Sequence, residues 1–320
     1  MSESFLTATR ARSSDAHVAP GIKGLVDESM AVAAARGMRE RATFSYRGVD
    51  IEYAELPDSE SNLLFGNVLW PAAETLSKLL IDQSRGGAKM WTADATMQLG
   101  IPLDMLIERR FGLRIQLPPS PTALEWLGLA SVVPDVSVAG TNVLEVGAGV
   151  GLTGLVCHAL GASVLLTDGE ARLVEALRAR HPSGEDATKM LRFDQLDWHV
   201  DSALAADSDA DDRTCERFDL ILGVELLNPA CCGEVHVPAL VRRRLARTPG
   251  ARAMLLSEVR RVETCLTAVH TLAMQGLRVA AFQVQGREAF QVRLDELPAV
   301  GSMLLLVAAW PPPTAAGGVR

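Results

Sequence analysis

The sequence predicts an α/β protein built on a doubly wound, mostly parallel sheet. Short apolar runs of strand length alternate with stretches of helical apolar spacing through residues 142–309. A glycine-dense turn follows the first of these runs, at residues 147–151, and opens a helix. The chain has 320 residues, of which 48 % are hydrophobic, and this is enough for one large domain with additions.

The N-terminal part predicts a flexible segment, a hairpin and a helix, in that order. Residues 1–41 carry Ala, Ser, Gly and charge without a strand pattern, so we expect a flexible segment. Apolar residues then alternate on either side of an Arg-Gly turn at 47–48, which is typical of a β-hairpin. Pro71 suits the first turn of a helix whose leucines at 76–80 form an apolar face.

A long insertion follows that helix and extends to residue 140. Helical spacing predicts short helices at 103–110 and 122–129, and the Pro-rich run 117–121 between them predicts extended chain. Two interpretations stay open for this insertion, an ordinary surface elaboration and a lid that faces the substrate.

Residues 142–168 predict a complete β-α-β unit. Strands are expected at 142–146 and 163–167, and a helix at 152–160 between them. Glycines at alternate positions let the backbone turn sharply and approach a ligand closely. The residues of this turn are Gly147, Ala148, Gly149 and Gly151. The helix after them points its free amide groups toward the same ligand.

Two acidic residues indicate which ligand the turn would bind. Glu145 stands next to the turn, where it would repel a pyrophosphate but would attract a cation or a hydroxyl. Asp168 ends the second strand, where a carboxylate can accept both hydroxyls of a ribose. A nicotinamide dehydrogenase is disfavoured, because the G-x-G-x-x-G spacing is absent here.

This unit resembles the first motif of the class I S-adenosylmethionine-dependent methyltransferases, E-x-G-x-G-x-G with an acid after the next strand. The resemblance implies S-adenosyl-L-methionine as the cofactor, bound by Glu145, by the turn at 147–151 and by Asp168. The alternative is an α/β domain whose glycines only make a tight turn.

The remaining elements complete the sheet that such a resemblance implies. Further strands are expected at 190–193, 218–224, 251–258, 277–284 and 302–309, with helices at 170–180, 233–246 and 262–274. With 142–146 and 163–167, this makes seven strands. The resemblance implies a Rossmann-like sheet of six parallel strands and one antiparallel strand. We therefore divide the chain into a flexible segment 1–41, an N-terminal region 42–140, a cofactor-binding methyltransferase domain 141–310 and a disordered tail 311–320.

The hairpin followed by G-x-x-x-W-P-A-A at 66–73 narrows the resemblance. It is similar to the seven-β-strand lysine methyltransferase-like group, methyltransferase family 16. In that group this segment packs over the cofactor, which implies that Trp70 lies near its methionine end. The family pattern L-x-W after the third strand is matched by Leu196, Asp197 and Trp198. The resemblance implies Asp194 or Asp197 at the adenine edge, with Trp198 beside the ring. A packing role for either tryptophan is the alternative.

The acceptor side departs from the family pattern. Relatives have a D-x-x-Y-like motif after the fourth strand, whereas Val224 here precedes Glu225 and Asn228. The resemblance implies catalytic roles for Glu225 and Asn228, with Val224 beside the cofactor. Asn228 lacks the aromatic hydroxyl, so three alternatives are open: a different substrate, weak transfer, or another aromatic residue in its place, for which Trp70 and Trp91 are the candidates. Arg260 is either the basic residue that relatives often have after the fifth strand or a surface charge.

Together these features predict methyl transfer from S-adenosylmethionine to a protein side chain, with lysine as the preferred acceptor. The sequence does not identify the substrate protein. A cofactor-binding scaffold with weak or no transfer and a small-molecule methyltransferase are the alternatives. The net charge of −8 argues against nucleic acid, and no run of roughly 18 apolar residues indicates a membrane span. The five cysteines form no C-x-x-C pair, so we expect no metal site. Their odd number fits a reducing compartment, which predicts a location in the cytoplasm and also in the nucleus. We expect a monomer, since no isolated apolar helix face demands a partner.

Overall fold

The structure, a computed structural model, describes residues 41–55, 66, 68–86, 91–92, 137–181, 190–201, 215–227, 232–286, 288–292 and 297–311. They belong to one compact unit, Arg39–Arg320. Residues 1–40 of the flexible segment, the two helices expected at 103–110 and 122–129, Asn228, and residues 312–320 of the tail lie outside these residues. The division at residues 41, 140 and 310 stays a prediction.

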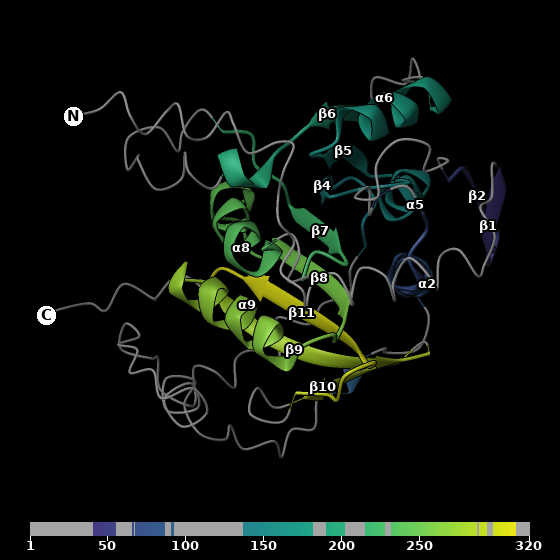
Figure 1. The fold of residues 1–320 in the computed structure, drawn as a ribbon. Helices are drawn as coiled ribbons and strands as arrows, with labels where there is room; N and C mark the ends of the chain where they lie inside the picture. Colours follow the sequence, from purple (N-terminus) through teal and green to yellow (C-terminus); the bar gives the residue numbers. More distant parts are fainter. Residues whose placement is uncertain are drawn as a thin grey trace, which may run out of the picture. The chain divides into compact units, whose positions relative to one another are not determined.

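One large sheet forms the centre of this unit (Figure 1). Its strands, in chain order, are β3 (Trp91–Thr92), β4 (Asn142–Val146), β5 (Ser163–Asp168), β6 (Leu191–Gln195), β7 (Leu220–Val224), β8 (Arg252–Glu258), β9 (Arg278–Gln285), β10 (Glu288–Val292) and β11 (Met303–Ala309). Across the sheet the order is β3-β10-β9-β11-β8-β7-β4-β5-β6. Strands β6, β5, β4, β7 and β8 pair in parallel, and β11 runs antiparallel to both β8 and β9. The predicted α/β fold is therefore confirmed, and the seven predicted strands are six parallel strands and one antiparallel strand, β11.

Two strands at one edge of the sheet were not expected. A turn at Gly286, with φ of +62°, returns the chain from β9 into β10, which pairs antiparallel with β9. The two-residue strand β3, from the region interpreted as an insertion, pairs in parallel with β10. Part of the insertion thus extends the sheet.

The helices lie close to their predicted positions. They are α2 (Pro71–Ser84), α5 (Leu152–Ala159), α6 (Ala171–Arg180), α8 (Gly233–Arg244) and α9 (Val262–Met274). Their ends differ from the prediction by a few residues, as helix ends usually do. The predicted hairpin is formed by β1 (Ala42–Tyr46) and β2 (Val49–Tyr53), which pair antiparallel.

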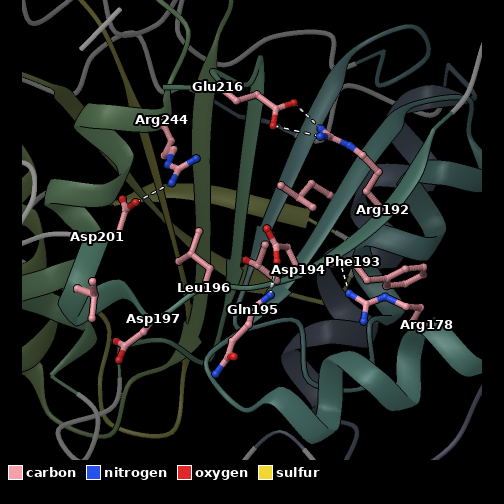
Figure 2. A pocket seen from close by; sticks show the side chains of 13 residues that line it. Arg178, Arg192, Phe193, Asp194, Gln195, Leu196, Asp197, Asp201, Glu216 and Arg244 are labelled. Atoms are coloured by element: carbon pink, nitrogen blue, oxygen red, sulfur yellow. Dashed lines mark hydrogen bonds and ion pairs between the residues drawn. The ribbon is translucent and has the colours of Figure 1, made fainter. Parts of the chain in front are cut away.

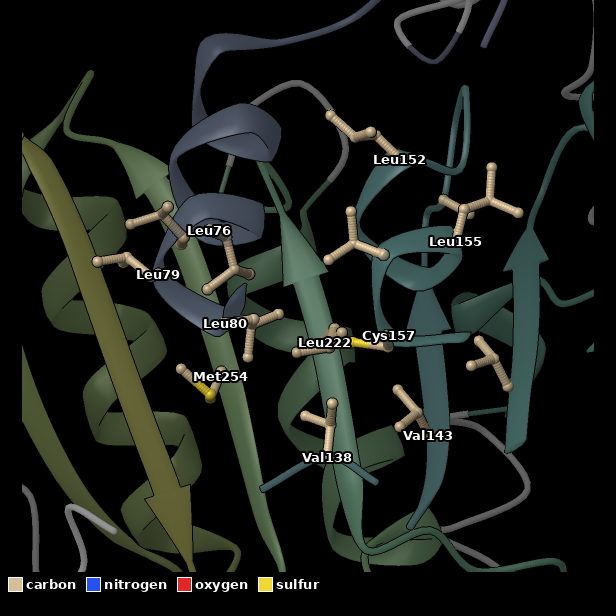
Figure 3. Close-up of a cluster of buried hydrophobic side chains, with 14 of the residues drawn as sticks. Leu76, Leu79, Leu80, Val138, Val143, Leu152, Leu155, Cys157, Leu222 and Met254 are labelled. Carbon is tan, nitrogen blue, oxygen red and sulfur yellow. The ribbon is translucent and has the colours of Figure 1, made fainter. Parts of the chain in front are cut away.

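Helices cover both faces of the sheet because its buried strands are apolar on both sides. Along β4, Val143 belongs to the core that includes α2 and α5, while Leu144 belongs to the core that includes α8 and α9. Figure 3 shows the first core, where leucines of α2 pack toward Leu222 of β7 and Met254 of β8. Packing of α2 in this core fixes the start of α2 above the carboxyl ends of the central strands.

The hairpin is fixed to the end of α2 by a buried acid. The Tyr46 hydroxyl donates to an Asp82 carboxylate oxygen at 2.9 Å, and Arg47 forms an ion pair with the same carboxylate. Hydrogen bonds to a charged group are the stronger ones in proteins. The hairpin is therefore anchored on α2, whose first residues line the site described next.

Candidate active site

The glycine turn between β4 and α5 forms the floor of a cavity. Gly147, Gly149 and Gly151 have φ of +63°, +54° and +80°, a conformation that residues with a Cβ rarely adopt. The cavity, of about 370 Å³, lies beyond the carboxyl ends of β4, β5 and β7. Open α/β sheets bind their ligands at this position. The lining includes most of the site residues expected from the sequence: Trp70, Glu145, Gly147, Ala148, Gly149, Asp168, Asp197, Trp198, Val224 and Glu225.

The chain that leads into α2 lies directly on the glycine turn. A Cβ added to Gly149 would lie only 2.8 Å from the carbonyl oxygen of Gly66. The backbone N–H of Leu69 donates to a Glu55 carboxylate oxygen at 2.9 Å, which holds this covering segment. Trp70 is the N-cap residue of α2 and lines the cavity. Glycine at position 149 is thus needed for the close approach of the covering segment.

Asp168 lies at the end of β5, on the rim of the cavity. Its Oδ2 accepts a hydrogen bond from the Gly149 backbone N–H at 3.0 Å, and its Oδ1 accepts one from Glu170 at 3.0 Å. Burial raises the pKa of Asp168, although these backbone hydrogen bonds act against the rise. Each carboxylate oxygen can accept more than one hydrogen bond, so the side chain keeps capacity for ligand hydroxyls.

Glu145 has a structural partner that the sequence did not indicate. Its carboxylate is buried, and Oε2 accepts a hydrogen bond from the Gly154 backbone N–H in α5 at 2.9 Å. Burial raises the pKa of Glu145 to about 8. The side chain therefore ties the first turns of α5 to β4 beneath the cavity.

Replacing Glu145 by glutamine tests the cost of burying this carboxyl group. The pKa of the folded state, about 8, exceeds the ordinary value of 4.5, so the folded state holds a proton that the unfolded state releases between these two values. Stability that depends on this group therefore falls as pH rises from 4.5 through about 8. Between pH 5 and pH 9 the free energy of unfolding should fall in the wild type, and it should fall less in Glu145→Gln. We expect the two decreases to differ by on the order of 3 kcal/mol. Urea unfolding at both pH values measures this difference. Glu175→Gln, at an exposed position of α6, is the control, and equal pH dependence of Glu145→Gln and the wild type would contradict the expectation.

The structure separates the two acids expected near the adenine. Asp197 and Trp198 line the cavity, and the Trp198 Nε1 is buried without a hydrogen-bond partner. Asp194 lines only a second cavity, of about 640 Å³, which Asp197 also lines, and its Oδ1 accepts a hydrogen bond from the Gln195 backbone N–H (Figure 2). Asp197 is therefore the better placed of the two for the adenine edge.

The arginines of the second cavity already have partners. Arg244 donates to Asp201 at 2.7 Å, Arg192 pairs with Glu216, and Arg178 donates to the Phe193 carbonyl oxygen at 2.8 Å (Figure 2). A ligand there would have to compete with these contacts. The smaller cavity over the glycine turn is the stronger candidate for the active site.

The end of the first cavity beside β7 is charged and aromatic. Glu225, with φ of +57°, accepts hydrogen bonds from the Glu258 backbone N–H at 3.1 Å and from Arg260 Nη2 at 3.2 Å. Burial raises the pKa of Glu225, and the Arg260 guanidinium acts against that rise. The Arg260 Cζ lies 5.3 Å from the centre of the Trp70 ring. Arg260 is therefore part of the site, and its interpretation as a surface charge is wrong.

Several lining residues were missed by sequence reasoning. Gly66 was quoted only as the start of the G-x-x-x-W-P motif, and His199 directly follows Trp198. The other missed residues are Val68, Leu69, Ala73, Val150, Leu152, Gly169, Glu170, Leu173, Leu196 and Leu226. Most of these residues lie next to a recognised motif in the sequence, and that position could have identified them as lining residues.

Comparison with known proteins agrees with this geometry. A family model described as lysine methyltransferase, methyltransferase family 16, matches residues 55–228, which is more than half of the chain. The chain belongs to the lysine methyltransferase family. This family member is 31 % identical over 147 residues to the protein N-lysine methyltransferase METTL21A of Danio rerio. That match covers 41 % of the chain and 61 % of the relative, so the chain spans about three fifths of the relative's length.

Solved structures of other methyltransferases are also similar to this lysine methyltransferase family member. A TehB-like S-adenosylmethionine-dependent methyltransferase from Corynebacterium glutamicum matches with a TM-score of 0.39 and 19 % identity, over 59 % of this chain and 95 % of that chain. A ribosomal protein L11 methylase from Lactobacillus delbrueckii subsp. bulgaricus matches with a TM-score of 0.37 and 17 % identity, over 61 % and 84 %.

The residues of the first cavity fit S-adenosylmethionine. The volume of this cavity, about 370 Å³, lies within the usual range of small-molecule pockets. The Asp168 carboxylate at one end could accept hydrogen bonds from ribose hydroxyls, and Trp198 offers an aromatic surface and a buried indole N–H without a partner. Within the described ranges, no cluster of His, Cys, Asp and Glu could hold a metal ion. No helix in the described part of the chain is long and apolar enough to cross a membrane.

Proposed function

We propose that this protein transfers a methyl group from S-adenosylmethionine to a lysine side chain of a protein. Family membership supports the lysine acceptor. The structural observation that carries the proposal is one continuous cavity, with Asp168 at one end and Glu225 with Trp70 at the other. A cofactor whose ribose lies at Asp168 then directs its methionine end toward β7.

The residues of the chain hold and shield the reacting groups. When bound, the cofactor supplies a methyl group on positively charged sulfur, and transfer forms the N–C bond as the S–C bond breaks with its electron pair left on sulfur. Asp168 and the glycine turn bind the cofactor half. The described residues of the covering segment, Gly66 and Val68 to Trp70, line the cavity, and Gly66 lies against Gly149, so the segment covers part of the cofactor site. Holding the nitrogen near the methyl carbon is the main contribution that such a site can make.

Incubation of the purified protein with labelled S-adenosylmethionine and a cell lysate tests this function. We expect labelled protein bands, with methyl-lysine after hydrolysis, over about pH 7 to 9. The Asp168→Ala variant serves as the matched control with weakened cofactor binding. Absence of label at every pH, while an active relative labels its own substrate in the same lysate, would refute the proposal.

A second candidate function is cofactor-dependent binding of a partner without efficient transfer. One observation favours it, since Arg260 already holds the Glu225 carboxylate at the acceptor end. Calorimetry that shows cofactor binding, together with no methyl-lysine on any captured partner, would support this candidate.

We also propose that the protein is a monomer of the cytoplasm or nucleus that does not bind nucleic acid. The four described cysteines are free thiols, which suits a reducing compartment. Light scattering of the purified protein measures the oligomeric state, and microscopy of a tagged chain measures its location.

A further inference from the structure

The acceptor end of the cavity contains an ion pair that lysine recognition does not require. The Glu225 and Arg260 side chains are only 8 % and 11 % exposed, and their charged groups are 3.2 Å apart. Buried pairs are screened far less by salt and water than surface pairs are. Because the opposite charges lie so close together, the guanidinium offsets the attraction that the carboxylate alone would exert on a cation in the cavity.

Arg260 also occupies the aromatic surface beside that carboxylate. Its Cζ lies 5.3 Å from the centre of the Trp70 ring, within the range in which a ring attracts a cation. A carboxylate and an aromatic face are the two groups that would recognise a positively charged side chain. Arg260 engages both of them from within the chain.

The other titratable groups around Glu225 do not replace this cation. Glu258 of β8 and Cys265 of α9 interact with Glu225 electrostatically, and neither carries positive charge. Glu263 of α9 and Glu234 of α8 lie near Cys265 and are also acids. The remaining titratable groups of the cavity are Glu145, Asp168, Glu170, Asp197 and His199, of which Asp168 and Glu170 lie at the opposite end, beside β5.

We propose that Arg260 is a specificity-determining residue for the acceptor. By pairing with Glu225 over Trp70, it makes this end of the cavity nearly neutral, so that an uncharged nitrogen is admitted and a fixed cation is disfavoured. The inference rests on the proposed function, because methyl transfer needs a free nitrogen lone pair. The ammonium group of lysine loses its proton to solvent before the nitrogen enters, and Arg260 favours that uncharged form.

Binding of n-butyltrimethylammonium, a permanently charged analogue of the lysine side chain, tests this inference without turnover. We measure its affinity by NMR titration with S-adenosylhomocysteine bound to the full chain. At a pH where Glu225 is ionised in the variant, Arg260→Gln is expected to bind the probe at least roughly tenfold more tightly than the wild type, because the carboxylate then has no cation beside it. Arg260→Lys keeps the charge and is expected to match the wild type. Equal binding of the probe by the wild type and Arg260→Gln would overturn the inference.

The double variant Glu225→Gln/Arg260→Gln protects this test against a folding defect in the single variant. It removes both charges and is expected to bind the probe more weakly than Arg260→Gln. Tight binding of the probe by the double variant would show that Glu225 is not the attracting group, and this would also overturn the inference.

The pH dependence of turnover supplies a readout that a purely structural role would not move. In Arg260→Gln the rising limb of kcat against pH is expected to shift upward by roughly one pH unit, whereas Arg260→Lys keeps the wild-type position. A uniform loss of kcat at every pH, or a faster Arg260→Gln variant, contradicts the inference. A wild type that methylates no protein refutes the proposed function instead, and the probe affinities then still decide the role of Arg260.

Discussion

Replacing Asp168 by alanine will weaken the binding of S-adenosylhomocysteine by roughly 5- to 150-fold. The change removes a carboxylate that can accept two charge-assisted hydrogen bonds from ribose hydroxyls, worth about 1 to 3 kcal/mol together. The structure adds a second reason, because Asp168 also accepts the hydrogen bond from the Gly149 backbone at 3.0 Å. Loss of that bond frees the glycine turn, on which we propose that the cofactor lies. Isothermal titration calorimetry measures the affinity directly.

Asp194→Ala is the matched control for this change. Asp194 is the same residue type near the end of the neighbouring strand, yet its side chain lies in the second cavity. We expect Asp194→Ala to keep the cofactor affinity of the wild type. If both variants lose affinity equally, the placement of the cofactor over the glycine turn is wrong. If neither does, Asp168 is only a loop anchor.

Local patterns were enough to predict most of the sheet and its helices. Buried parallel strands are apolar runs of a few residues, and each helix here keeps its apolar spacing, so the sequence alone reports both. Strand β10, with the sequence EAFQV, was missed because its five residues do not alternate between polar and apolar, and its pairing depends on the turn at Gly286. Strand β3 has only two residues, and its pairing with β10 bridges distant parts of the chain.

The candidate site shows the same limit. The motif that names Asp168 is local, since it lies in one β-α-β unit. Asp197 reaches the first cavity and Asp194 does not, although both follow the same stretch of sequence, and the motif does not contain that information. The pairing of Glu225 with Arg260 joins the ends of β7 and β8. Contacts between strand ends follow from the sheet order, which the sequence reveals only through a family resemblance.

Changing Gly149 to alanine is expected to lower both cofactor affinity, by at least roughly tenfold, and thermal stability. The backbone there has φ of +54°, which costs a residue with a Cβ about 1 to 2 kcal/mol. The new methyl group would also lie 2.8 Å from the Gly66 carbonyl oxygen. Since that backbone atom cannot rotate away as a side chain can, the covering segment must move off the glycine turn. Calorimetry with S-adenosylhomocysteine and thermal unfolding measure the two effects.

Gly140→Ala separates backbone strain from this contact. Gly140 has φ of +75°, and nothing lies within 4 Å of an added Cβ, so its alanine variant carries the strain alone. We expect Gly140→Ala to lose about 1 to 2 kcal/mol of stability, the cost of a Cβ at positive φ, and to keep the cofactor affinity of the wild type. The additional loss in Gly149→Ala then measures the covering segment at Gly66. Equal stability and equal affinity of the two variants would mean that the segment does not rest on the glycine turn, and that the cavity is open to solvent above Asp168.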